Sequence, residues 1–160
     1  MVSPELLKRY PFFGSLSQSQ LKAIASLAEE QHLKEGTEIF EECAEATTLY
    51  LLIEGGIDLY YRSQEEYHPK SMKEFHVDQI NPGEVFGISA LIEPYALNAT
   101  ARSSQECHVI AFDATAMRAL FTEDVPLAYN IMTQVAKTVM ERLGYARVQL
   151  AAAWADKTGV

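Results

Sequence analysis

The chain has 160 residues, of which 48% are hydrophobic, and this size and composition suit one globular domain with a sizeable core. Its formal net charge of -9 disfavours nucleic acid binding by this chain alone, because the phosphate backbone would be repelled. No apolar run is long enough to span a bilayer, and the N-terminus lacks the features of a signal peptide. We therefore expect a cytoplasmic protein with no membrane partner.

The first part of the chain is predicted to be helical, over residues 4–30, with Pro11 dividing two segments. Ser17 and Gln20 form a capping-box pattern that begins the second segment. From Gly36 the pattern changes to short apolar or alternating runs, which predict strands. These runs lie at residues 37–41, 49–53, 57–61, 75–80, 99–103 and 107–112, with a polar connection at 62–71 and a turn at 81–84.

Two helices are predicted after the strands. Asp113 is a natural N-cap for residues 114–121, and Pro126 begins a long helix whose apolar residues recur at intervals of three and four. Helices on both sides of a run of short strands predict an antiparallel β-roll, or jelly roll, with flanking helices. We expect one domain over residues 1–160, with N-terminal helices at 1–30, a β-roll at 36–112, C-terminal helices at 113–155 and no DNA-binding domain.

Four short motifs follow one another along the chain. They read PFFGSLS at residues 11–17, GTEIF at 36–40, LYLLIEG at 49–55 and NPGEVFG at 81–87. Their order and spacing resemble the cyclic nucleotide-binding domain of catabolite activator proteins and protein kinase regulatory subunits, over about residues 6–150. The resemblance implies a regulatory sensor for signal transduction, like the ligand-sensing domains of transcription regulators. The family usually has a glycine where Cys43 falls, so Cys43 is expected to lie in a turn.

The resemblance also locates a ligand pocket. In the family, a glutamate holds the ribose hydroxyl and an arginine pairs with the cyclic phosphate, but Ile88 and Leu97 stand at these positions here. Because burying a phosphate without a cationic partner is costly, tight binding of cAMP or cGMP is not expected. The candidate pocket residues are Phe86, Gly87, Ile88, Ser89, Ala90, Leu97, Asn98, Ala99 and Thr100.

Three readings of this pocket stay open. Arg102 is the nearest cation in the sequence and could replace the missing arginine, although a solvent-facing strand arginine is the simpler interpretation. The apolar replacements suit a small apolar effector. They suit equally a pocket filled by Ile88 and Leu97, in which case the chain would be a structural module for protein–protein interaction.

The last helix carries two further expectations from the resemblance. Tyr145, Ala146 and Gln149 are expected to cap the pocket. The helix is also expected to pair with its twin in a homodimer, since its apolar stripe continues beyond the part that would pack on the roll. The candidates for this dimer seam are Val139, Leu143, Ala146 and Leu150.

No catalytic role is expected. The chain lacks a nucleophile–base motif and a phosphate-binding glycine loop of the P-loop type. A cupin-like metal enzyme is the least favoured alternative, because no two of the four histidines lie at ligand spacing on one strand. These histidines are His32, His68, His76 and His108. Neither a metal nor another cofactor is expected. Cys43 and Cys107 are too isolated to form a disulfide framework.

Overall fold

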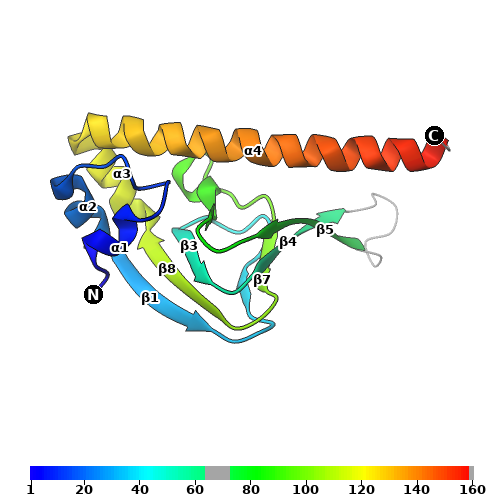
Figure 1. The fold of residues 1–160 in the computed structure, drawn as a ribbon, viewed down its shortest axis with the longest axis horizontal. Coiled ribbons are helices and arrows are strands. Elements are labelled where there is room, and N and C mark those ends of the chain that lie inside the picture. Colours follow the sequence, from blue (N-terminus) through cyan, green and yellow to red (C-terminus); the bar gives the residue numbers. More distant parts are fainter. Residues whose placement is uncertain (64–72, 159–160) are drawn as a thin grey trace.

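The structure, a computed structural model, describes residues 1–63 and 73–158. Most of the predicted connection at 62–71 lies outside these residues, as does His68. The strands form two antiparallel sheets, ordered β1-β8-β3-β6 and β2-β7-β4-β5. The short helices lie at one end of the strands, and the long C-terminal helix runs along one side (Figure 1). The strands are β1 (Ala28–Leu33), β2 (Glu38–Phe40), β3 (Thr48–Glu54), β4 (Ile57–Ser63), β5 (Lys73–Ile80), β6 (Val85–Phe86), β7 (Thr100–Ser103) and β8 (Cys107–Asp113). The predicted β-roll with flanking helices is confirmed.

The helices occupy both ends of the described chain. They are α1 (Pro4–Lys8), α2 (Gln18–Ala25), α3 (Ala114–Glu123) and α4 (Val125–Thr158), and a short 3₁₀ turn, η1 (Ile88–Leu91), lies between β6 and β7. The predicted capping box is present: Gln20 N–H donates to Ser17 Oγ at 3.2 Å, and Ser17 N–H donates to Gln20 Oε1 at 3.0 Å. Asp113 caps α3 by accepting a hydrogen bond from Ala116 N–H at 3.1 Å, also as predicted.

The N-terminal boundary between helix and strand was predicted wrongly. The helix α2 ends at Ala25, and residues 28–33 form β1, paired with β8 from Ala28 opposite Phe112 to Leu33 opposite Cys107. The helix therefore does not reach residue 30, and the roll begins before residue 36. The sequence of β1 is AEEQHL, which has no apolar alternation. Its strand conformation depends on pairing with the apolar strand β8, a tertiary effect that local propensity does not report.

The core has two parts that meet at β3 and β8. On one face of these strands, Leu49 and Phe112 are fully buried against the helices, and the Phe112 ring lies 5.1 Å from that of Phe13. On the other face, Leu52 and Val109 are buried inside the roll. Because side chains alternate along each strand, β3 and β8 contribute apolar residues to both parts of the core.

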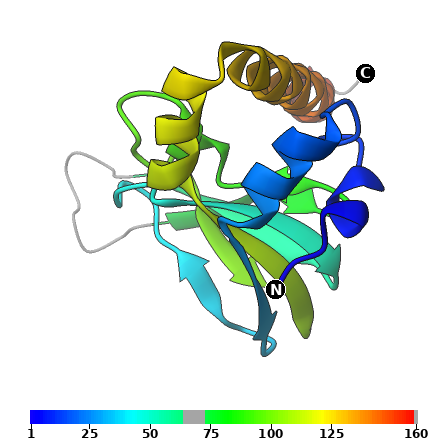
Figure 2. The same ribbon diagram turned by 90° about the vertical axis from the view of Figure 1, so that its left-hand side faces the viewer.

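The long helix α4 is anchored by buried apolar side chains over its first turns. Leu127, Ile131 and Val135 are buried there. The start of α4 lies beside α3 and the N-terminal helices (Figure 2). Farther on, α4 passes along the roll and extends beyond it (Figure 1). In this later part of α4, the side chains of Leu150 and Trp154 are exposed. No helix within residues 1–63 and 73–158 is long and apolar enough to cross a membrane.

Gly87 connects β6 to η1 in a conformation that a side chain would disturb. Its φ is +75°, and a Cβ atom there would lie 2.9 Å from the carbonyl oxygen of Thr48. We expect Gly87→Ala to lower the free energy of unfolding by about 2–3 kcal/mol, measured by urea denaturation. Gly36→Ala is the matched control, since Gly36 has φ +80° but no atom within 4 Å of an added Cβ. Equal losses in both variants would show that the contact with Thr48 is unimportant.

Candidate ligand-binding site

A cavity of about 400 Å³ lies between the roll and α4. Both elements are needed to form it, because the two walls come from distant parts of the chain. The roll contributes Leu59, Val77, Asp78, Ile88, Asn98 and Ala99, and α4 contributes Val139, Arg142, Leu143, Tyr145 and Ala146. An adjoining cavity of about 490 Å³ shares Val77, Asp78, Arg142 and Tyr145 with the first and reaches Gln149. A larger hollow of about 600 Å³ is lined mainly by β1, β3 and β8, and by none of the candidate residues.

The cavity brings together several residues that the sequence singled out. Ile88, Asn98 and Ala99 line its roll side, while Tyr145 and Ala146 line its helix side. The residues Val139 and Leu143, candidates for the dimer seam, also line it. They remain 43% and 41% exposed, so they form the rim of the cavity and still present surface to a partner.

Other candidates are packed inside the protein. Phe86 is fully buried, and its ring stacks on Tyr50 with centroids 5.0 Å apart. Ala90 and Leu97 belong to the buried core, while Gly87 and Ser89 lie at the start of η1. The backbone of Leu97 accepts a hydrogen bond from Cys43 N–H at 2.8 Å. These residues support the site without lining the cavity.

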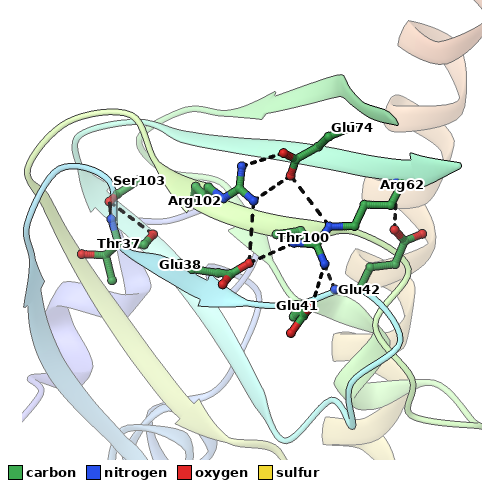
Figure 3. Close-up of polar contacts among 9 residues, drawn as sticks. All are labelled: Thr37, Glu38, Glu41, Glu42, Arg62, Glu74, Thr100, Arg102 and Ser103. Carbon is green, nitrogen blue, oxygen red and sulfur yellow. Dashed lines mark hydrogen bonds and ion pairs between the residues drawn. The ribbon is translucent and has the colours of Figure 1, made fainter. Parts of the chain in front are cut away.

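The residues Thr100 and Arg102 lie on the outer face of β7. Side chains alternate along a strand, so these two point away from the cavity that Ala99 lines. Thr100 Oγ1 accepts a hydrogen bond from Glu42 N–H at 3.0 Å, and Arg102 Nη1 donates to Glu74 at 2.9 Å (Figure 3). This hydrogen bond raises the pKa of Arg102 above its ordinary value. To act as a phosphate partner, Arg102 would have to leave Glu74.

The outer face around Arg102 is a network of opposite charges. Arg62 donates to Glu41 at 2.6 Å and to Glu38 at 3.4 Å, and Arg102 approaches Glu38 at 3.8 Å (Figure 3). The hydrogen bond to Glu41 raises the pKa of Arg62. Carboxylates surround both arginines, so this surface does not favour an anion.

Sequence reasoning missed Arg142, the cation that does line the cavity. Its Nη2 donates to the carbonyl oxygen of Val85, and its Nε lies 4.0 Å from Asp78 Oδ2. Burial lowers the pKa of Arg142, while the neighbouring Asp78 carboxylate acts in the opposite direction. Arg142 lies two helical turns after buried Val135, and this spacing is the signal that could have placed it on the inner face of α4.

Cys43 adopts the left-handed backbone conformation, with φ 71°. It is exposed, and its position in the turn after β2 agrees with the glycine that the family usually has there. The thiol of Cys107, by contrast, is buried and lies 3.3 Å from the carbonyl oxygen of Gly56.

The geometry defines a cyclic nucleotide-binding fold, and comparison with known proteins gives the family. The family model described as "Cyclic nucleotide-binding domain" matches residues 30–124. A putative cyclic nucleotide-binding protein from Geobacter metallireducens GS-15 is 36% identical over 89% of this chain and 99% of its own, with a TM-score of 0.78. The chain therefore belongs to the cyclic nucleotide-binding domain family, and the predicted resemblance is confirmed.

Two more distant structures share the fold. The catabolite activator protein of Thermus thermophilus is 22% identical, over 89% of this chain and 62% of its own, with a TM-score of 0.67. The second is the regulatory subunit of a cAMP-independent protein kinase A from Trypanosoma brucei, in a mutant form bound to cAMP in its A site. It is 18% identical over 91% of this chain and 49% of its own, with a TM-score of 0.72. No curated protein matches the chain.

We expect Arg142→Ala to lower the free energy of unfolding by about 1–2 kcal/mol, because the Val85 carbonyl and Asp78 would lose a largely buried charged partner. Urea denaturation measures the change. Arg147→Ala, at an exposed position on the same helix, should change the free energy of unfolding by no more than about 0.5 kcal/mol. A similar change in both variants would contradict a special role for the contact of Arg142 with the roll.

Proposed function

We propose that this chain is a non-enzymatic, cytoplasmic sensor domain that binds a small, mainly apolar ligand and does not bind cAMP or cGMP tightly. One observation carries the proposal: Ile88, at the position of the family's ribose-binding glutamate, lines a cavity whose walls are mostly apolar. The ligand would fill this space, and α4 would report its presence because it forms one wall. A partly apolar cavity with a few polar groups is the usual form of a small-molecule site.

The charges around the cavity argue against a cyclic phosphate. Leu97 stands where the family has its phosphate-binding arginine, and it is buried in the core. Arg142 supplies a cation from the opposite wall, but it already donates to the Val85 carbonyl. Asp78 also lines the cavity, and its carboxylate would repel a phosphate. Arg142 could instead anchor one polar or anionic end of an otherwise apolar ligand.

The trypanosome kinase subunit offers a parallel. That protein is described as cAMP-independent, and the form described as bound to cAMP carries three substitutions, one of which introduces an arginine. The parallel supports the idea that such arginines govern cyclic nucleotide binding in this fold. It also suggests that substitutions at the present cavity would introduce cAMP binding.

A regulatory role without catalysis fits the residues at the site. Among the described residues, those that line the cavity include no histidine, cysteine or serine, which are the side chains that most often act as bases or nucleophiles. Asp78, the carboxylate there, lies beside Arg142. We therefore propose that the domain recognises a ligand and that α4 responds to the bound ligand.

Calorimetric titration with cAMP and cGMP tests the proposal. We expect no binding by the natural chain up to millimolar concentration, because neither the glutamate nor the arginine of the family is present. The double variant Ile88→Glu and Asn98→Arg changes two side chains that line the cavity, and it should gain measurable cAMP binding. Its circular dichroism melt shows whether the variant is folded. Micromolar binding of cAMP by the natural chain would overturn the proposal.

A fluorescent probe tests the apolar site directly. 8-Anilinonaphthalene-1-sulfonate combines an apolar ring system with one anionic group, so it matches the apolar walls and Arg142. We expect saturable binding that Arg142→Ala weakens, whereas Arg147→Ala leaves it unchanged. If the natural chain gives no saturable signal, the cavity is not a ligand site, and the alternative of a structural interaction module is favoured.

We also infer that α4 pairs with a second copy of the chain in a parallel homodimer. Two series of side chains recur at seven-residue spacing along one flank of α4, which is the pattern of a coiled-coil seam. They are Val125, Met132, Val139, Ala146 and Ala153, and Tyr129, Ala136, Leu143 and Leu150. Tyr129 and Leu150 are 74% and 59% exposed, so a large part of this flank is uncovered in the single chain.

Substitution within this flank tests the homodimer. We expect Leu150→Glu to shift the protein from dimer to monomer in analytical ultracentrifugation, because it would place a charge inside the apolar seam. Val148→Glu is the matched control, since Val148 is 69% exposed on another side of the helix. A monomeric natural chain, or dissociation by both substitutions alike, would contradict pairing through this seam.

A further inference from the structure

Glu30, His32 and His108 form a cluster on the sheet that contains β1 and β8, away from the residues that line the ligand cavity. The register of these strands places His32 directly opposite His108. Glu30 precedes His32 by two residues and therefore projects from the same face of β1. The two imidazole rings stack with centroids 4.5 Å apart and an interplanar angle of 17°.

One ring nitrogen in this cluster lacks a hydrogen-bond partner. His108 Nε2 is buried, yet it makes no hydrogen bond with any residue that the structure describes, although Glu30 Oε2 lies 3.5 Å away. A buried polar atom without a partner is unfavourable, and in native proteins it commonly marks a group that binds an ion or water. His108 Nε2 is therefore able to coordinate a metal ion.

We propose that Glu30, His32 and His108 bind a divalent transition metal ion of the zinc type. Two imidazoles and one carboxylate are a common donor set for such ions in proteins. One ligand atom from each of the three residues lies within 4.8 Å of the others. Tetrahedral zinc with bonds of about 2.0–2.1 Å holds its ligands about 3.3 Å apart, so the side chains need to close by at most about 1.5 Å.

The site is open on one side. A cavity of about 320 Å³ at this end of the sheet is lined by His32 and His108 together with Glu54 of β3. An ion can enter from there, and water can complete its coordination. The metal would link the edge strand β1 to the central strand β8, so it should stabilise the fold. The proposal does not depend on the ligand cavity or on its occupant.

Calorimetric titration of the untagged, EDTA-treated full chain with Zn²⁺ tests the site. We expect one ion per chain with a Kd at or below about 10 µM, together with a higher melting temperature. The variants His32→Ala and His108→Ala should each weaken binding at least about tenfold. Cobalt(II) provides a second readout, because tetrahedral coordination gives intense visible absorption that these variants should lose.

Two further variants make the outcome decisive. Glu30→Gln keeps the size of an exposed side chain and should weaken Zn²⁺ binding even if a histidine variant unfolds. His76→Ala is the matched control, because His76 lies 3.2 Å from the Asp58 carboxylate but is outside this cluster. Full binding by His76→Ala with weaker binding by the cluster variants would support the proposal. No Zn²⁺ binding by the natural chain, or unchanged binding by Glu30→Gln and His108→Ala, would overturn it.

Discussion

The anchorage of α4 on the roll is the constraint on which the rest of this structure depends. Leu127, Ile131 and Val135 are buried in the core, and burying each such side chain contributes about 1.5–3 kcal/mol. Because a helix is stiff, these first turns also decide where the next turns lie. Arg142 extends the contact by donating to the Val85 carbonyl. The cavity between the roll and α4 exists because α4 continues over the roll beyond its anchor.

This arrangement places the two roles that we propose for α4, ligand binding and pairing, at neighbouring positions. Val139 and Leu143 line the cavity and remain partly exposed. A ligand that changes the position of these residues would also change the surface that a second α4 meets. A coupling between the proposed ligand and the proposed dimer would therefore need no distant pathway, since the same side chains would contact both.

The two sheets differ in the chemistry of their outer faces. The outer face of β7 and β4 holds Arg62 and Arg102 among carboxylates, and the arginines are engaged in ion pairs (Figure 3). On β1 and β8, by contrast, a pair of histidines faces a glutamate, and one ring nitrogen has no hydrogen bond within the described part of the chain. The arginines on β4 and β7 are already paired with carboxylates, whereas the histidines and the glutamate on β1 and β8 are side chains that can bind a metal ion.

The sequence by itself determined the class of fold and most of the elements. The capping box at Ser17, the apolar runs of β3, β4 and β8, and the motifs shared with the family are local signals, so they can be recognised one segment at a time. These signals also located Ile88, Asn98, Tyr145 and Ala146, which line one cavity. The local pattern was misleading at residues 28–30, where pairing with β8 outweighs a helical appearance.

Only the tertiary structure decided which way the polar side chains point and what they meet. Arg102 is close to the pocket residues in sequence, but strand alternation turns it to the opposite face and towards Glu74. Arg142 is distant in sequence, but α4 carries it to the cavity. His32 and His108 become neighbours through the register of β1 with β8. The physical reason is the same in each case: contacts between distant segments are set by packing and strand pairing, which no local pattern encodes.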